Sequence, residues 1–142
     1  MENIDFYNKS VIDFGTGTGI LAILAEKCGA SRVTAIDLDE WSMKNASENI
    51  KANNCHRILL RQQSDLAGIE SADIILANIN LNVLKNEVSS IASAVKKGTF
   101  LLASGFLLND LSEMEIVFEG KGFVKCKTEQ HEDWLAILFR KK

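Results

Sequence analysis

Short apolar runs and longer stripes of apolar residues follow one another along the chain, and this pattern predicts alternating strands and helices. The runs have the length of buried strands, and glycine, asparagine and aspartate separate them from the stripes, as expected at turns and helix ends. The strands predicted in the first three quarters of the chain are residues 11–14, 32–36, 58–63, 72–77 and 100–103. The third is half polar and is expected at a sheet edge.

Four helices are expected among these strands, because apolar residues recur there every three or four positions. The second covers residues 40–52. The third covers residues 81–95 and ends at two lysines followed by Gly98, as the helix dipole favours. The fourth opens at Asp110 with a capping box that Glu113 completes. The first helix is expected to bury the face formed by Ile20, Leu21, Ile23 and Leu24.

The C-terminal part of the chain predicts an antiparallel hairpin. Residues 123–128 alternate with lysines, residues 129–133 form the turn, and residues 134–139 are uniformly apolar. The connection is too short for a parallel crossover. Because the final strand is too apolar for an edge, it is expected between the fifth and sixth strands. The predicted fold class is α/β, a mostly parallel seven-stranded sheet in the order 3-2-1-4-5-7-6 with strand 7 antiparallel.

The strongest candidate for chemistry is the glycine turn after the first strand. Glycines let a ligand approach the backbone closely, and the N–H groups at the following helix start favour a polar or anionic group. A dinucleotide fingerprint would need its third glycine at position 20, where the chain has isoleucine. The turn therefore predicts another kind of nucleotide pocket. Its residues are Asp13, Gly15, Thr16, Gly17 and Gly19.

Two aspartates end the second strand, where its tip is expected alongside the glycine turn. Asp37 lies eighteen positions beyond Gly19, and a carboxylate there can accept hydrogen bonds from both hydroxyls of an adenosine ribose. Either aspartate could instead cap the next helix. We expect Asp39 to be the cap and Asp37 the ribose ligand. Trp41, in the first turn of that helix, is expected to cover core rather than to flank the base.

Polar side chains at two further strand tips extend the predicted crevice. Asp65 follows the third strand, where it either bonds the adenine amino group or is a solvated loop residue. Asn78 follows the fourth strand, at the point where the strand order reverses and open α/β sheets bind ligands. Carbonyl oxygens of Asn78, from backbone or side chain, could hold an amine acceptor by its protons. An ammonium group cannot attack, so the acceptor must first lose a proton.

Composition excludes several other kinds of site. The net charge of −3 gives no general basic surface for a nucleic-acid backbone, so no direct contact with nucleic acid is expected. The three cysteines are scattered and there are only two histidines, at 56 and 131, which predicts no metal site. The chain shows no signal peptide and no membrane-length apolar run. We therefore expect a cytoplasmic protein with reduced cysteines and no membrane contact.

The glycine turn, read as Asp-x-Gly-x-Gly-x-Gly between a strand and a helix, resembles motif I of the Rossmann-like class I S-adenosylmethionine-dependent methyltransferases. Within that superfamily, almost the whole chain resembles the catalytic domain of the bacterial methyltransferases that modify ribosomal protein L11. The Asn-Ile pair and the tryptophan-containing tail are the more particular features. The segments that carry the resemblance are residues 11–23, 77–80, 104–106 and 132–136.

This resemblance implies N-methylation of lysine side chains, or of an α-amine, in a ribosomal protein, with S-adenosylmethionine as cofactor and Asn78 as the catalytic residue. The implied cofactor-binding residues are Asp13, Gly15, Thr16, Gly17, Gly19, Asp37, Asp65 and Asn78. Family members carry a substrate-binding domain upstream of the glycine turn. Residues 1–142 are accordingly expected to be a single S-adenosylmethionine-binding catalytic domain without that upstream domain.

Other functions stay open at this point. Methyltransferases of glutamine amides or adenine usually carry Asn/Asp-Pro-Pro-aromatic after the fourth strand, whereas this chain has Asn-Ile-Asn-Leu at 78–81 and contains no proline. A methyltransferase for another substrate, such as a small molecule or RNA, is one alternative. A cofactor-binding module without catalytic activity is the other.

Overall fold

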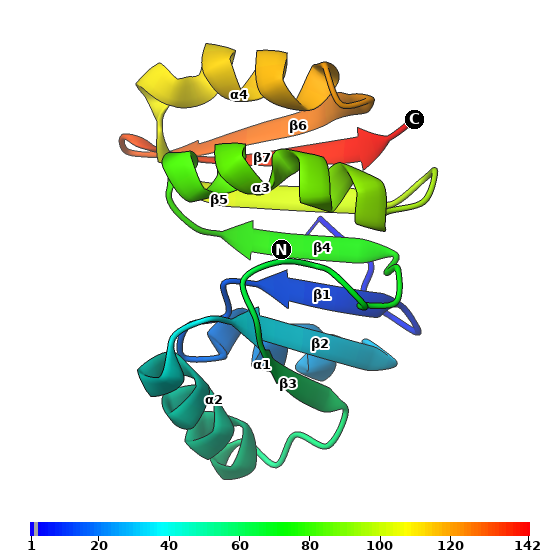
Figure 1. Ribbon diagram of the computed structural model, residues 1–142, viewed down its shortest axis with the longest axis vertical. Coiled ribbons are helices and arrows are strands. Elements are labelled where there is room, and N and C mark those ends of the chain that lie inside the picture. The colour runs from blue at the N-terminus through cyan, green and yellow to red at the C-terminus, as the bar shows by residue number, and fades with distance from the viewer. Residues whose placement is uncertain (2) are drawn as a thin grey trace. The chain divides into compact units, whose positions relative to one another are not determined.

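The computed structural model describes Met1 and residues 3–142, and strands alternate with helices along the chain as predicted (Figure 1). The elements in chain order are β1 (Ser10–Phe14), α1 (Ile20–Lys27), β2 (Arg32–Asp37), α2 (Glu40–Ala52), β3 (Ile58–Gln62), β4 (Ile74–Asn78), α3 (Leu81–Ala94), β5 (Phe100–Leu107), the 3-10 turn η1 (Leu108–Asp110), α4 (Leu111–Glu119), β6 (Phe123–His131) and β7 (Trp134–Lys141).

The strands of the described residues form one sheet in the order β3-β2-β1-β4-β5-β7-β6, which confirms the predicted order and the α/β fold class. β1, β2 and β3 pair in parallel, and β7 runs antiparallel to both β5 and β6. The half-polar β3 lies at an edge, as predicted. By its internal contacts the chain divides into two compact units. The N-terminal unit is Met1–Ser64 with Ala72–Leu76, and the C-terminal unit is Asp65–Ser71 with Ala77–Lys142.

In the N-terminal unit, α1 buries a different face from the one predicted. Ala22 and Ala25 are fully buried, whereas Ile20 and Leu24 are 67% and 42% exposed. The reason is close packing, because α1 contacts β1 and β2 and two methyl side chains let its backbone approach the strands. The prediction followed the larger apolar residues, which outnumber the alanines.

The predicted bounds of the second helix, α2, and its predicted N-cap, Asp39, are confirmed. The Oδ2 atom of Asp39 accepts a hydrogen bond from the N–H of Ser42 at 2.8 Å, the contact expected of an N-cap. Ala46 and Ile50, four positions apart, are buried on one face of the helix. The chain leaves the helix through Asn54, which takes a φ of +53°.

In the C-terminal unit, α3 and α4 pack side by side (Figure 1). On α3 the buried residues are Leu84, Val88 and Ile91, which recur every three or four positions as predicted. The predicted capping box of α4 is wrong. Asp110 accepts a hydrogen bond from the N–H of Leu107 at 2.9 Å, because the 3-10 turn before the helix directs its carboxylate backward, and Glu113 instead forms an ion pair with Lys85.

Three strands of this unit are longer than predicted, and β7 is one of them because it continues to Lys141. β5 continues to Leu107, with a bulge between Ser104 and Phe106 that preserves its pairing with β7. β6 continues to His131, so the hairpin turn is Glu132-Asp133 alone. The polar residues at the end of β6 suggested a loop because they lie on an edge strand and are exposed, and exposed strand residues need no apolar pattern.

Candidate functional site

The glycine turn forms an open loop between β1 and α1. Gly15, Gly17 and Gly19 take φ values of +73°, +55° and +83°, the left-handed region that favours glycine. A Cβ atom at Gly19 would lie 3.2 Å from the Cβ of Ala46, so this glycine packs against α2. A Cβ atom at Gly17 would meet nothing within 4 Å. The loop is therefore open on the side that Gly17 faces.

Backbone hydrogen bonds attach the loop to the end of β2. The N–H groups of Gly15 and Thr16 both donate to the carbonyl oxygen of Ile36, each at 2.9 Å. The next N–H, that of Gly17, donates to the Oδ2 atom of Asp37 at 2.8 Å. Three consecutive donors of the loop thus bond to two consecutive residues of the neighbouring strand.

Asp13 supports the loop from its buried side. Its side chain is 1% exposed, and its Oδ2 atom accepts hydrogen bonds from the hydroxyl of Thr16 at 2.6 Å and from the N–H of Ala22 at 3.0 Å. Burial raises the pKa of Asp13 from 3.8 to about 6, because the charged form is poorly solvated there. These two hydrogen bonds lower the pKa, and the nearby charge of Asp37 raises it. The structure thus places Asp13 and Thr16 in contact with each other.

Asp37 lies beside the loop, as the sequence predicts. Besides accepting from Gly17, its carboxylate accepts a hydrogen bond from the N–H of Asp39 at 3.0 Å through Oδ1. Each carboxylate oxygen has room for a second hydrogen bond, so the ribose assignment stays a prediction. Trp41 does not cover core: it is 68% exposed, with the Nζ atom of Lys44 5.4 Å from its ring centroid. The alternative, that it flanks the base, stays open.

The two remaining site residues belong to the C-terminal unit. Asp65 is half-buried, and its Oδ1 atom accepts a hydrogen bond from the N–H of Ala67 at 2.9 Å, which shapes the loop that follows β3. Its proposed contact with adenine stays a prediction. Asn78 is the exposed last residue of β4, and its Oδ1 atom accepts a hydrogen bond from the hydroxyl of Ser104 at 3.2 Å.

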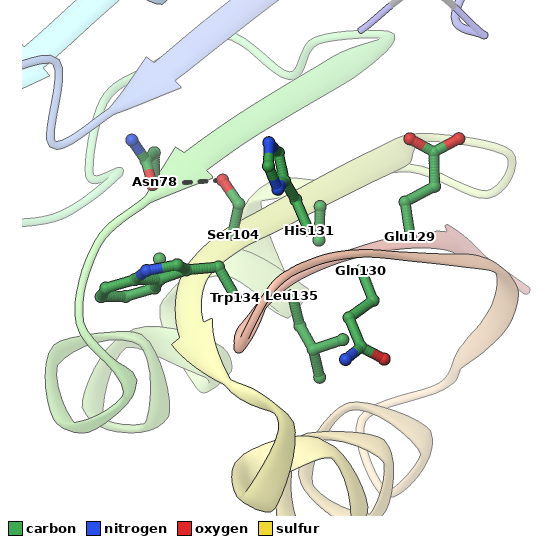
Figure 2. A pocket seen from close by; sticks show the side chains of 9 residues that line it. Asn78, Ser104, Glu129, Gln130, His131, Trp134 and Leu135 are labelled. Carbon is green, nitrogen blue, oxygen red and sulfur yellow. Dashed lines mark hydrogen bonds between the residues drawn. The ribbon is translucent and has the colours of Figure 1, made fainter.

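Asn78 stands in the wall of a pocket of about 420 Å³ at the ends of β4, β5, β6 and β7 (Figure 2). Figure 2 shows Asn78 and Ser104 directed toward each other from neighbouring strands. The pocket brings together residues from three of the four segments that carry the family resemblance. Its lining residues are Asn78, Ser104, Gly105, Glu129, Gln130, His131, Trp134, Leu135 and Ala136.

Several of these pocket residues were missed from the sequence. Glu129, Gln130 and His131 were placed in a turn, whereas they are the last residues of β6. The signal for Ser104 and Trp134 was the resemblance alone, which assigned them no role. Across Met1 and residues 3–142, no three His, Cys, Asp or Glu side chains are grouped so that they could hold a metal ion. Over the same residues, no helix is both long and apolar enough to cross a membrane.

The raised pKa of Asp13 predicts a specific dependence of stability on pH. A carboxyl whose pKa is higher in the folded state stabilises the fold below its unfolded pKa, and this contribution is lost as the pH rises through the folded pKa. The free energy of unfolding contributed by Asp13 should therefore fall by about 2 kcal/mol between pH 4 and pH 7.

Urea denaturation of the wild type and of Asp13→Asn across this range tests the expectation. The other carboxyl groups titrate in both proteins, so they cancel in the difference between the two free energies of unfolding. As the pH rises, the free energy of unfolding of the wild type should fall relative to that of Asp13→Asn. A change in the opposite direction would show that the loop stabilises the charged form of Asp13.

Comparison with known proteins gives a consistent set of relatives. A family model described as ribosomal protein L11 methyltransferase (PrmA) matches residues 1–142. A protein named ribosomal protein L11 methyltransferase from Porphyromonas gingivalis is 40% identical over 139 residues, which cover 96% of this chain and 48% of that protein. One of the same name from Halalkalibacterium halodurans is 38% identical and covers 97% and 45%. The chain thus spans about half the length of the curated relatives it matches.

The solved structures agree with this result. A crystal structure of ribosomal protein L11 methylase from Lactobacillus delbrueckii subsp. bulgaricus superposes with a TM-score of 0.93 at 31% identity, covering 99% of this chain and 74% of the other. A putative S-adenosylmethionine-dependent methyltransferase from Listeria monocytogenes, 15% identical, shares the fold with a TM-score of 0.80, covering 98% and 93%. The chain therefore belongs to the ribosomal protein L11 methyltransferase (PrmA) family.

Proposed function

We propose that this chain binds S-adenosylmethionine at the glycine loop and transfers its methyl group to amine groups, chiefly lysine side chains, of a ribosomal protein of the L11 type. The observation that carries the proposal is the pairing of Asp37 with the N–H of Gly17 beside a loop that is open at Gly17. The names of the relatives support the acceptor, since the Porphyromonas gingivalis and Halalkalibacterium halodurans proteins are both named for ribosomal protein L11.

The residues of the loop fit this cofactor. A side chain at position 17 would fill the open side of the loop, as expected where a ligand lies against the backbone. Asp37 offers carboxylate oxygens to the ribose hydroxyls, and Asp65 is proposed to bond the adenine amino group. When bound, the cofactor supplies a methyl group on a positively charged sulfur.

The charges around the loop favour a cationic ligand. Asp13 lies beneath the loop and Asp37 beside it, and the charge of Asp37 contributes to the raised pKa of Asp13. With a pKa of about 6, Asp13 is mostly ionised at neutral pH. Two carboxylates attract the sulfonium and ammonium groups of S-adenosylmethionine and repel the diphosphate of a dinucleotide. This electrostatic argument agrees with the spacing of the glycines.

The pocket around Asn78 suits an amine on a long apolar stem. Carbonyl oxygens of Asn78 can accept hydrogen bonds from the protons of the acceptor nitrogen and orient it for in-line attack. Trp134 is 55% exposed and offers an aromatic face to a cation, while Leu135 and Ala136 provide apolar contact for the methylene groups of a lysine. The bound ammonium group must lose a proton before it attacks.

Residues 1–142 are proposed to act as one cofactor-binding and methyl-transferring domain. About half of the length of the curated relatives lies outside the matched region. We propose that recognition of the acceptor protein draws partly on that other half in this family, while the binding of the cofactor and the orientation of the amine reside in the residues described above.

Filling the loop at Gly17 should abolish cofactor binding. Gly17→Val puts a branched side chain into the open side of the loop, and we expect the affinity for S-adenosylmethionine in isothermal titration calorimetry to fall at least about a hundredfold. Gly98→Val is the matched control, because Gly98 also has a positive φ and open space around its Cβ position. An affinity of Gly17→Val equal to that of the control would exclude the loop as the cofactor site.

Removing the carboxylate of Asp37 should weaken cofactor binding, because the proposed hydrogen bonds to the ribose hydroxyls are lost. We expect Asp37→Ala to weaken the binding of S-adenosylhomocysteine at least about tenfold, because charge-assisted hydrogen bonds are lost. Asp39→Ala should lower the free energy of unfolding by about 1 kcal/mol through loss of the helix cap, with the affinity nearly unchanged. The 2′-deoxy analogue separates the roles of Asp37: an equal loss of affinity for both ligands would mean that Asp37 only supports the loop.

Replacing Asn78 should affect transfer and spare cofactor binding. The chain is incubated with S-adenosylmethionine and an L11-type ribosomal protein, and methylated lysine is measured by mass spectrometry. Asn78→Ala should lower the turnover at least about tenfold by misorienting the amine, with an unchanged affinity for the cofactor. Asn86→Ala, at an exposed position of α3, is the control. Methyl transfer to RNA or a metabolite in place of the protein would contradict the proposed acceptor.

A further inference from the structure

The side chain of Asn78 is held by a neighbouring strand. Its Oδ1 atom accepts a hydrogen bond from the Ser104 hydroxyl on β5 at 3.2 Å (Figure 2). We propose that Ser104 and Gly105 are positioning residues, which fix the orientation of the Asn78 amide so that it meets the acceptor amine in one arrangement. This inference rests on the proposed function for its catalytic consequence. The contact itself is a property of the fold.

The backbone of β5 is irregular at the place where it meets Asn78. Ser104 pairs with Ala136 of β7, and Phe106 pairs with Leu135, so Gly105 is the extra residue of a β-bulge. Gly105 takes a φ of +92°, which a residue with a side chain rarely adopts. Bulges redirect side chains, and they are frequent beside active sites.

Gly105 also lets β5 approach the end of β4 closely. A Cβ atom at position 105 would lie 2.8 Å from the Oδ1 atom of Asn78, and 3.2 Å and 3.4 Å from the carbonyl oxygen and the nitrogen of Ile79. Two of these neighbours are backbone atoms and cannot move aside easily. A hydrogen atom is therefore all that fits between the bulge and the Asn78–Ile79 peptide. Ser104 and Gly105 thus restrain the same amide, one by a hydrogen bond and one by contact.

Restraint of this amide matters because its two ends differ chemically. The χ2 angle of an asparagine is broadly distributed, so an unrestrained amide would also turn its NH2 group toward the acceptor. That group donates hydrogen bonds and cannot accept one from an amine N–H. The hydrogen bond from the Ser104 hydroxyl occupies one of the two acceptor positions of Oδ1 and fixes the plane of the amide. Ser104 therefore acts through Asn78, without contact to the cofactor being required.

Side-chain NMR of the unliganded chain tests the restraint without any reliance on activity. In the wild type, the order parameter of the Asn78 side-chain amide should be near a rigid value of about 0.85, and in Ser104→Ala it should fall below about 0.6. Ser93→Ala is the control, since it also removes one side-chain hydrogen bond in the same unit, to the carbonyl oxygen of Ser89. An unchanged order parameter in Ser104→Ala would overturn the proposal.

Turnover measurements then test the catalytic consequence. We expect Ser104→Ala to lower kcat about tenfold with an unchanged KM for S-adenosylmethionine, and Ser104→Thr, which keeps the hydroxyl, to retain most of the activity. In the Asn78→Ala background, Ser104→Ala should cause no further loss. A further tenfold loss in that background, or a matching loss of cofactor affinity, would show that Ser104 acts independently of Asn78 and would contradict the proposal.

The two measurements separate this inference from the proposed function. If no variant transfers a methyl group, including the wild type, the proposed function fails, and the NMR comparison still decides whether Ser104 restrains Asn78. Gly105→Ala provides a second perturbation, expected to displace the Asn78 amide resonances more than Ser104→Ala does, because the added Cβ collides with Oδ1. Unmoved Asn78 resonances in a folded Gly105→Ala variant would exclude the contact that the bulge is proposed to make.

Discussion

The carboxylate of Asp13 lies beneath the glycine loop, where one oxygen atom accepts hydrogen bonds from Thr16 in the loop and from Ala22 in the first turn of α1. The end of β1, the loop and the helix start are thereby joined at a single atom. An unpaired carboxylate in this position would cost several kcal/mol. The two hydrogen bonds offset part of that cost. The pKa of Asp13 is still raised, because they do not offset all of it. The buried charge thus makes the conformation of the loop and the burial of Asp13 depend on each other.

The end of β2 also holds the glycine loop in place by hydrogen bonds. Ile36 accepts two N–H groups of the loop through its carbonyl oxygen, and Asp37 accepts the third through its carboxylate. Because these three N–H groups are already bonded within the protein, they are not available to a ligand. The charges next to the loop are the carboxylates of Asp13 and Asp37. This differs from the anion-binding helix start expected from the glycine spacing alone, since the N–H of Ala22 is also taken by Asp13. A cationic cofactor suits such a loop better than a phosphate does.

The predicted order of the strands from β3 to β5 is the one associated with class I methyltransferases and is not set by local patterns. The sequence predicted the elements and the C-terminal hairpin because these do follow from local patterns: apolar runs, helical stripes, and the short connection between β6 and β7. It failed where tertiary packing decides between local options. The buried face of α1 depends on how closely the helix approaches the sheet. Ala22 and Ala25 are therefore buried instead of the larger apolar residues of the helix. The residues near His131 were missed for a different reason: they pair with β7 across the adjacent hairpin turn, but exposed polar residues of an edge strand show no apolar pattern. The glycines and Asp37 could be assigned to the loop, but the hydrogen bond from Ser104 to Asn78 joins two strands and has no local signature.

The loop and the pocket share one structural principle. In each, a glycine with positive φ lies beside a polar side chain at the end of a neighbouring strand: Gly17 beside Asp37, and Gly105 beside Asn78. At Gly105 the absence of a Cβ allows the backbone to come close to Asn78, whereas a Cβ at Gly17 would meet nothing within 4 Å and the glycine there serves the positive φ of the loop. A hydrogen bond from Gly17 itself, or from Ser104 beside Gly105, then fixes the polar group. A side chain fixed in this way loses little further entropy when a ligand binds. For an in-line methyl transfer, whose rate depends on the alignment of nitrogen, carbon and sulfur, that preorganisation is the main contribution a protein can make.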